Sequence, residues 1–301
     1  MRVLLLGGLP GQWQAHPDGR DVASGIEAWM YCFPDSWHSC GATCTPEFVR
    51  EFDLIIANTA RVGFTENLLR LQQERRPDSK WVSLIEGCGA SYLDPDARVR
   101  KLLAGSDLVN VINRHTLEYF RALSGVRCEY IGIPYPAEQI RAKYPRNNGK
   151  GVYLPMPLRN FQSSVLAALP HRLKLHGIDS ANPFDVDIEL HPPSVYQEYY
   201  ALLARDAWAF VDLDPRYTWK RNVLDCAAIG IPCISTVSGG HAKHFFPHLE
   251  VQNAFSVTEA GDLLEELRKF PHFYREVSTV PMEKFAEFTH DFMRDKLLAS
   301  L

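Results

Sequence analysis

The sequence lacks several features that would assign it to a specialised class. No apolar run among its 301 residues reaches the roughly 18 that a membrane-spanning helix requires. Net charge is only −4, so no overall basic field favours nucleic acid or a membrane surface. We find no short-period repeat, low-complexity tract or coiled-coil heptad pattern. With 46% apolar and 23% charged residues, the chain has the composition of an ordinary globular protein of about two domains.

Cysteine provides no framework either. The seven cysteines are odd in number and spread along the chain, which favours reduced thiols and a cytoplasmic location over disulfides. Cys32, His38, Cys40 and Cys44 cluster, but their spacing matches no zinc pattern. The start of the chain resembles a signal peptide only weakly, because its short apolar run leads directly into a glycine turn. We therefore predict a first buried strand there.

Apolar strands alternate with amphipathic helices along the whole chain, which predicts parallel sheets covered on both faces. The clearest predicted strands are Val3–Leu6, Phe52–Ala57, Trp81–Ile85, Leu108–Ile112, Cys128–Ile133, Gly151–Leu154, Leu173–His176, Ala207–Leu213 and Ile231–Thr236. The predicted helices include Ser24–Tyr31, Glu66–Glu74, Thr116–Leu123, Leu158–Leu169, Val195–Ala204, Lys220–Ile229, Ala260–Phe270 and Pro281–Leu298.

A cluster of proline, asparagine and glycine between Pro134 and Gly149 is the best linker candidate. It lies near the middle of the chain, and each half has its own glycine turn after a strand. These two features favour a pair of open sheets over the competing closed eight-stranded barrel.

The most informative stretch is Ala207–Lys243. An apolar strand ends at Asp212–Asp214, a helix follows from Lys220 with Thr218 as a plausible N-cap, and Gly230 stands where a C-cap glycine belongs. A second strand then leads into Ser238–Gly240. This strand–helix–strand unit collects polar groups at its strand exits, where open parallel sheets bind their ligands.

At these residues the chain resembles the GT-B glycosyltransferases, specifically the retaining nucleotide-sugar enzymes related to glycogen and sucrose synthases. Segment order is similar over nearly the whole chain, and the specific likeness is confined to about Ala207–Gly240. The segments that carry the resemblance are Ser106–Val109, Asn113–Thr116, Glu129–Pro134, Ala207–Leu213, Val223–Ala227, Gly230–Ser235 and Gly239–Gly240.

The resemblance implies an α/β fold of two Rossmann-like domains facing each other across a cleft. We expect an acceptor-side domain over residues 1–143, a nucleotide-sugar-binding domain over 144–275, and a C-terminal helix over 276–301 that returns to the first domain. The implied substrate is a nucleotide-diphosphate sugar. The implied acceptor is a hydroxyl of a saccharide, a small molecule or a modified polymer, and no cofactor or metal is required.

The resemblance also assigns donor-site residues. Asp225 matches the family carboxylate that accepts hydrogen bonds from the ribose hydroxyls, a chemistry that suits a diol. Tyr217 stands where the family has a glutamate that holds the donor sugar. Because of this departure, the sequence does not identify the donor sugar. Lys220 and Arg221 begin a helix, an unfavourable place for cations unless an anion such as a diphosphate binds there. The alternative is that Lys220 and Arg221 are ordinary solvated residues on the surface.

A second set of candidates follows from glycine turns and from the family loop after the first strand of the donor domain. Arg159 matches the family arginine that stabilises the departing diphosphate, although the lysine expected later in that loop is absent. Gly8, Gly239 and Gly240 let backbone N–H groups approach a phosphate, and His241 follows as a donor to phosphate or sugar.

On the acceptor side, Glu86 follows a predicted strand and is a candidate to orient an acceptor hydroxyl or act as its base. Gly7 with Gly8, and Ser24 with Gly25, are expected to shape the same side. A loop carboxylate without function is the alternative for Glu86.

Two possible metal-binding patterns do not fit the segments around them. His241, His244 and His248 have helical spacing, but Pro247 interrupts it and they match no standard triad. Asp212–Asp214 spells the metal-binding pattern of the other glycosyltransferase fold, GT-A, yet the surrounding segments fit GT-B.

The sequence thus predicts a cytoplasmic glycosyltransferase that transfers a sugar to an acceptor hydroxyl with retention and without a metal. Arg159, Lys220 and Glu86 are the catalytic candidates. A nucleotide-sugar epimerase or hydrolase on the same fold, or a catalytically inactive nucleotide-sugar-binding protein, are the alternatives.

Overall fold

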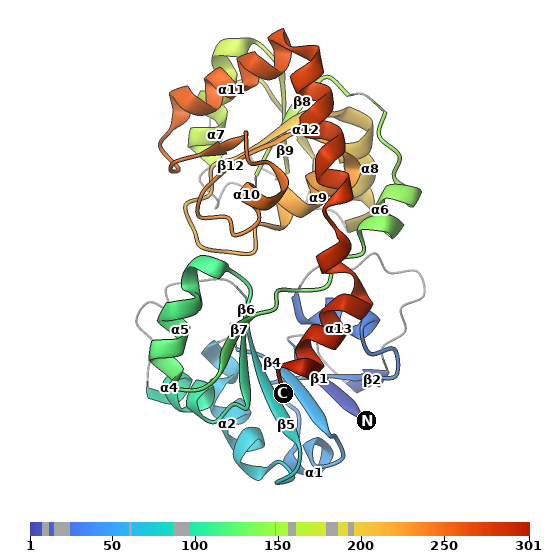
Figure 1. The fold of residues 1–301 in the computed structure, drawn as a ribbon, viewed down its shortest axis with the longest axis vertical. Coiled ribbons are helices and arrows are strands. Elements are labelled where there is room, and N and C mark those ends of the chain that lie inside the picture. The colour runs from blue at the N-terminus through green and yellow to red at the C-terminus, as the bar shows by residue number, and fades with distance from the viewer. Residues whose placement is uncertain are drawn as a thin grey trace. The chain divides into compact units, whose positions relative to one another are not determined.

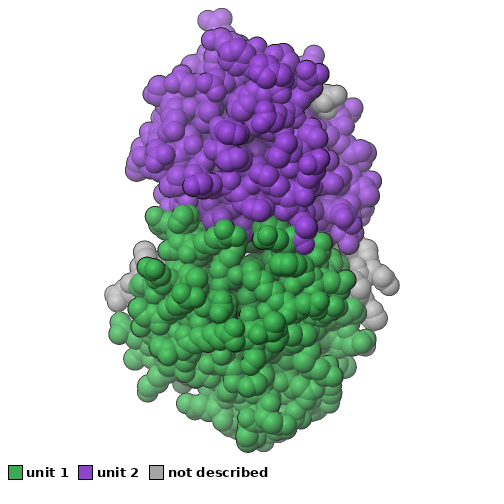
Figure 2. Space-filling view, viewed as in Figure 1, with its two compact units in different colours: residues 1–135, 217–219, 287–301 green, residues 136–216, 220–286 purple. Residues whose placement is uncertain are grey.

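The computed structural model describes residues 1–7, 12–14, 25–59, 62–86, 97–147, 149–155, 161–178, 186–191 and 196–301. The chain forms two compact units, which Figure 2 shows in different colours. The first contains residues 1–135, 217–219 and 287–301, and the second contains residues 136–216 and 220–286.

The first unit is built on a seven-stranded sheet of order β2-β3-β1-β4-β5-β6-β7 (Figure 1). All neighbouring strands are parallel except the edge pair β2–β3. Central strands such as β1 and β4 are buried at every position, as strands covered on both faces must be. The strands are β1 (Val3–Gly7), β2 (Gln12–Gln14), β3 (Trp37–Cys40), β4 (Leu54–Asn58), β5 (Lys80–Ile85), β6 (Leu108–Val111) and β7 (Cys128–Tyr130).

Short helices with clear start and stop signals cover this sheet. Thr45 caps α1 by accepting a hydrogen bond from the Phe48 N–H, with Pro46 in the first helical turn, and Gly125 ends α5 in the left-handed conformation. Before residue 136, the described helices are the 3₁₀ segments η1 (Gly25–Tyr31), η2 (Val62–Phe64) and η3 (Arg114–Thr116), and α1 (Pro46–Val49), α2 (Thr65–Glu74), α4 (Ala97–Ala104) and α5 (Leu117–Ser124).

The second unit contains a fully parallel six-stranded sheet of order β10-β9-β8-β11-β12-β13. Counted from its own first strand, this is the order 3-2-1-4-5-6 of a dinucleotide-binding Rossmann sheet. The strands are β8 (Gly151–Leu154), β9 (Lys174–Ile178), β10 (Ile188–His191), β11 (Ala207–Asp212), β12 (Cys233–Thr236) and β13 (Glu250–Val251).

Helices lie on both faces of the second sheet, with α7 and α11 on one side and α8, α9 and α12 on the other (Figure 1). They are α6 (Ala137–Lys143), α7 (Phe161–Ala168), η5 (Leu169–His171), α8 (Tyr196–Asp206), α9 (Arg221–Ile229), α10 (Ala242–Phe245), α11 (Val257–Lys269) and α12 (Pro271–Glu283). Helix α6 packs on α9, where Arg141 donates to the Ala228 carbonyl. It therefore belongs to the second unit, whereas the predicted first domain extends to residue 143.

Two separate sheets, parallel apart from the edge pair β2–β3, confirm the predicted α/β class and exclude the closed barrel. The predicted helix Pro281–Leu298 is wrong as one element. Helix α12 ends at Glu283, the 3₁₀ turn η6 (Ala286–Phe288) follows, and α13 (His290–Ala299) begins after Thr289. The Thr289 hydroxyl accepts from the Phe292 N–H, so a side-chain cap starts a new helix.

This break coincides with the change of unit. Helix α12 belongs to the second unit, while η6 and α13 belong to the first, apart from Ala286. Within the first unit, the Cys32 thiol donates to the His290 carbonyl at 3.2 Å, and the Tyr135 N–H donates to the Phe288 carbonyl at 3.0 Å. The last helix is therefore part of the N-terminal unit, as the resemblance implies.

None of the helices in the described part of the chain pairs the length with the hydropathy that a bilayer-spanning segment requires.

The end of α9 gives a stability prediction. Gly230 adopts a φ of 83°, and a Cβ there would lie 3.0 Å from the Met282 sulfur and 3.1 Å from the Ser278 carbonyl oxygen. We expect Gly230→Ala to combine backbone strain with this contact and to destabilise the second unit by about 2 kcal/mol. Calorimetric unfolding of the full chain measures the loss.

Gly125→Ala is the matched control, because Gly125 has a φ of 67° but a Cβ added there would have no other atom within 4 Å. It should lower the melting temperature less than Gly230→Ala. Equal losses at the two positions would mean that the contact with α12 contributes nothing.

Candidate functional site

The second sheet reverses its direction of growth between β8 and β11, so these neighbouring strands form its topological switch point. Ligands of open parallel sheets bind outside the carboxyl ends of the strands at such a point. Strand β8 ends at Leu154 and β11 at Asp212, and the Leu213 N–H donates to the Ser164 hydroxyl of α7 at 3.2 Å. Arg159 follows β8 in sequence and lies outside the described residues.

The loop after β11 is densely hydrogen-bonded around Asp212 and Asp214, which are both buried. Asp212 accepts from the Asp214 N–H at 3.2 Å and from the Asn222 side chain at 3.0 Å, and the Asp214 carboxylate pairs with Arg216 at 2.7 Å. Burial raises the pKa of Asp214, but the Arg216 hydrogen bond and the Lys220 charge outweigh it, so the pKa is lowered overall. Both carboxylates thus have partners within the chain, which weakens the GT-A metal interpretation of this loop.

Lys220 is the N-cap of α9 and has a φ of 51°, rare for a non-glycine residue. The residue is 3% exposed. Its amine donates to the Asp214 carbonyl and, at 3.0 Å, to the Thr236 hydroxyl, and lies 3.8 Å from the Asp212 carboxylate. This cation joins the loops after β11 and β12. Its predicted contact with a diphosphate stays a prediction.

Gly239 lies beside Lys220, where the loops after β11 and β12 meet. A Cβ at this position would lie 2.6 Å from Cγ of Lys220, so only glycine lets the lysine stem pass. The Thr236 and Ser238 hydroxyls both donate to the Asp214 carbonyl, at 2.7 and 3.0 Å. Gly240 lies in the following turn, and His241 is buried as the N-cap of the four-residue helix α10. The phosphate-binding roles of Gly240 and His241 stay predictions.

Asp225 lies one turn into α9 and is 1% exposed. Tyr200 of α8 donates its hydroxyl to Asp225 at 3.2 Å, and the Arg221 guanidinium pairs with the same carboxylate at 3.4 Å. Arg221 also donates to the Tyr200 hydroxyl at 2.9 Å. The structure therefore brings Asp225 and Arg221 together in one triad with Tyr200. Sequence reasoning missed Tyr200 because its register against α9 depends on the packing of two helices.

Tyr217 and its neighbours belong to the first unit. The Tyr217 ring is 45% exposed and contacts the His115 ring edge-on, with centroids 5.9 Å apart. Thr218 is not the N-cap of α9, because Lys220 occupies that position. The Thr218 carbonyl accepts from the Asn113 side chain at 2.9 Å. Trp219 is buried against Tyr135. Tyr217 is therefore part of the first unit, whereas the Asp225 triad is part of the second.

The first unit has a second candidate site at the exits of β4 and β5. Asn58 donates its amide to the Glu86 carboxylate at 2.6 Å, which fixes the predicted catalytic carboxylate. Gly25 has a φ of 64°, and a Cβ there would lie 2.6 Å from Glu86. The Gly25 backbone thus lies close to the carboxylate, and the role of Gly25 in shaping an acceptor side stays a prediction. Gly8 lies outside the described residues, and Asn58 was missed because a lone asparagine carries no motif.

Two thiols of the Cys and His cluster in the first unit donate to backbone carbonyls. The Cys32 thiol donates to a backbone carbonyl of α13 and the Cys44 thiol to the Thr45 carbonyl. Burial raises the pKa of both thiols, which keeps them protonated, and burial lowers the pKa of His38 to about 4.

We compared the chain with known proteins. No family model matches the sequence, and no curated protein matches it either. Solved structures do match. A trehalose-6-phosphate synthase, OtsA, superimposes with a TM-score of 0.75 at 8% identity over 99% of this chain and 98% of its own. An alpha-glucosyltransferase in complex with UDP and a 13-mer DNA gives 0.65 at 10% identity, covering 99% and 97%.

A UDP-forming alpha,alpha-trehalose-phosphate synthase from Burkholderia xenovorans gives 0.66 at 13% identity, covering 84% of this chain and 74% of its own. The chain has the GT-B fold.

Within the GT-B fold, the six-stranded unit corresponds to the half in which the resemblance places the nucleotide-sugar. Its described candidate residues form two groups, which meet at the start of α9. One group is Asp225 with Arg221, and the other is Lys220 with Gly239. The second group consists of internal contacts, which gives Lys220 a stabilising role that a ligand-free experiment can detect.

Lys220→Met keeps the apolar stem and removes the ammonium. We expect a loss of on the order of 3 kcal/mol in the stability of the second unit, because the Asp214 carbonyl and Asp212 lose a buried cation. Urea unfolding without any nucleotide measures it.

Lys243→Met, which removes an exposed cation of α10, is the control and should leave stability within about 0.5 kcal/mol of the wild type. If Lys220→Met unfolds like this control and changes only nucleotide affinity, then Lys220 faces a ligand instead.

Proposed function

We propose that this protein is a glycosyltransferase. It transfers a sugar from a nucleoside-diphosphate donor to an acceptor hydroxyl, with retention at the anomeric carbon and without a metal in the transfer step. The described cysteines are all free, buried thiols, which is consistent with a reducing, cytoplasmic location.

The observation that carries the proposal is the Asp225 carboxylate, held by Arg221 and Tyr200 on the helix that directly follows the switch-point strand β11. A carboxylate accepts two hydrogen bonds from a vicinal diol, and the ribose of a nucleotide presents one. Tyr200 and Arg221 hold the carboxylate in one position before a ligand arrives, so little ordering remains for binding to accomplish.

Charge supports the diphosphate half of the donor. Arg221 is the first residue of α9, and its side chain is 15% exposed. The N–H groups of the first helical turn point out of the N-terminal end of the helix, where the positive end of its dipole lies. An anion at this end of α9 would gain from the guanidinium and the helix dipole together. We assign Arg159, in the segment between β8 and α7, to the departing diphosphate.

In the proposed reaction the protein positions the substrates and stabilises charge. The bond from the anomeric carbon to the diphosphate breaks, and the bond from that carbon to the acceptor oxygen forms on the same face. The acceptor proton passes to the leaving diphosphate, so no protein nucleophile is needed. Arg159 and Arg221 stabilise the negative charge that develops on the diphosphate.

For the acceptor we propose the site at the exits of β4 and β5. Glu86 would accept a hydrogen bond from the acceptor hydroxyl, while Asn58 keeps the carboxylate in place. The net charge of −4 favours a saccharide or other small acceptor over DNA, because binding to nucleic acid draws on basic surface.

The second candidate function is binding of a nucleotide-sugar without transfer. Tyr217 replaces the sugar-holding carboxylate of the resembling family, and the amine of Lys220 is engaged inside the unit. Epimerisation or hydrolysis of the donor on the same fold is a further alternative, which donor turnover without any acceptor would indicate.

The ribose assignment of Asp225 is testable by pairing a protein variant with a ligand variant. In the wild type, UDP should bind about tenfold more tightly than 2′-deoxy-UDP, because the deoxy ligand lacks one hydrogen bond to a charged acceptor. Asp225→Ala should reduce this preference to about twofold or less. Isothermal calorimetry measures all four affinities, after a thermal-shift panel has established the preferred base.

Asp262→Ala, an exposed carboxylate of α11, is the control and should keep the full preference. An Asp225→Ala variant that still discriminates the two ligands like the wild type would remove Asp225 from the ribose site.

A further inference from the structure

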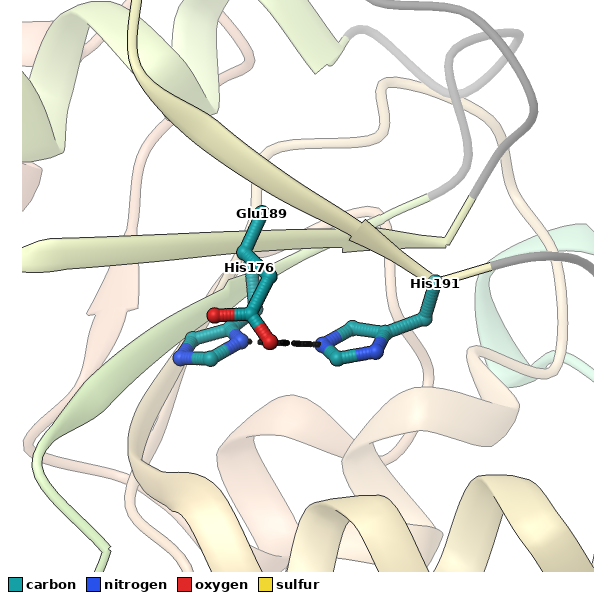
Figure 3. A group of neighbouring side chains, drawn as sticks. All are labelled: His176, Glu189 and His191. Carbon is teal, nitrogen blue, oxygen red and sulfur yellow. Dashed lines mark hydrogen bonds and ion pairs between the residues drawn. The ribbon is translucent and has the colours of Figure 1, made fainter.

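A group of side chains outside the donor and acceptor sites lies on strands β9 and β10 of the second unit. His176 is in the middle of β9, and Glu189 and His191 are on β10. The register places Glu189 directly opposite His176, and His191 is two residues further along the same strand. Since alternate residues of a strand point to one face, all three side chains project from the same face of the sheet. Figure 3 shows them turned toward one another.

The donor atoms of the three residues converge. Nδ1 of His176 lies 2.9 Å from Nε2 of His191, and that nitrogen lies 4.0 Å from Oε1 of Glu189. All three ligand atoms lie within 4.8 Å of one another. Tetrahedral zinc, with bonds of about 2.0–2.1 Å, holds its ligand atoms roughly 3.3 Å apart. The two nitrogens would therefore separate by a few tenths of an ångström and the carboxylate oxygen would approach by roughly 1 Å.

The two imidazoles are buried, and the carboxylate is open to solvent. His176 and His191 are 2% and 8% exposed, and the Tyr153 ring stacks on His176 with centroids 4.8 Å apart. The Glu189 side chain is 45% exposed, so an ion has a path from solvent.

The two carboxylate oxygens have different neighbours. Lys174 pairs with Oε2 of Glu189, whereas Oε1 faces His191. A carboxylate that is held through one oxygen presents the other as a single ligand, which is the arrangement that outer partners of metal ligands commonly enforce.

We propose that His176, Glu189 and His191 form a zinc site, with two imidazole nitrogens, one carboxylate oxygen and a water as ligands. The proton of the His176–His191 hydrogen bond moves to the other nitrogen of its own ring when the ion binds, so both imidazoles remain neutral. Because the ligands come from β9 and β10, the ion ties the edge strand β10 to the sheet and stabilises the second unit by mass action. The site is distinct from the donor site and needs neither nucleotide nor acceptor.

Calorimetric titration of chelator-treated full chain with zinc chloride tests the proposal. The wild type should bind one zinc ion and melt at a higher temperature with it, and Co²⁺ in place of zinc should give the visible absorption of a tetrahedral site. His191→Gln should weaken zinc binding by about 100-fold or more, and Glu189→Gln by about tenfold or more. Mutation of residues that only hold a metal ligand in place already lowers metal affinity by about 10- to 100-fold.

His272→Gln, which removes an exposed histidine of α12, is the control and should bind like the wild type. Glu189→Gln changes an exposed side chain, so it tests the site even if a buried histidine variant does not fold. Binding that neither Glu189→Gln nor His191→Gln weakens would place the ion elsewhere. A wild type that binds zinc no more tightly than His191→Gln would overturn the proposal.

Discussion

The geometry of the donor half depends on one buried cation. The amine of Lys220 holds the Asp214 carbonyl and the Thr236 hydroxyl, and the Thr236 and Ser238 hydroxyls converge on that same carbonyl. A buried ammonium without partners would be too costly to keep, so the loops after β11 and β12 must close around it. The left-handed conformation of Lys220 turns its side chain inward at the residue where α9 begins. The start of α9, and with it Arg221 and Asp225, is therefore placed by a contact that involves no ligand.

The sequence predicted the parts of the fold whose signal is local. Strands such as β1 and β4 are buried at every position, as parallel strands between two helical layers must be, and their alternation with helices was enough for the fold class. Strands β3 and β10 were missed because they contain polar residues such as His38 and Glu189, so their short runs do not stand out from loops. The break before α13 was missed because apolar residues at helical spacing continue on both sides of Thr289, which caps the new helix.

The candidate site was predictable to a similar extent. The place of Asp225 and Arg221 followed from the strand–helix–strand pattern, and the structure joins them in one triad. The burial of Lys220 did not follow, because a cation at a helix start suggests a bound anion when its backbone conformation is unknown. The cluster of His176, Glu189 and His191 was not predicted. Glu189 and His191 are 13 and 15 positions after His176, and only the register between β9 and β10 brings them onto one face.

The central claim is that the chain turns over a nucleotide-sugar, and release of the nucleoside diphosphate tests it most directly. Phosphorus NMR of the full chain with a nucleotide-sugar that calorimetry shows to be bound would follow the diphosphate through the reaction, with and without a panel of hydroxyl acceptors. We expect free nucleoside diphosphate to accumulate only when an acceptor is present. A bound nucleotide-sugar that stays intact with every acceptor would contradict the claim and leave a nucleotide-sugar-binding protein on the GT-B fold.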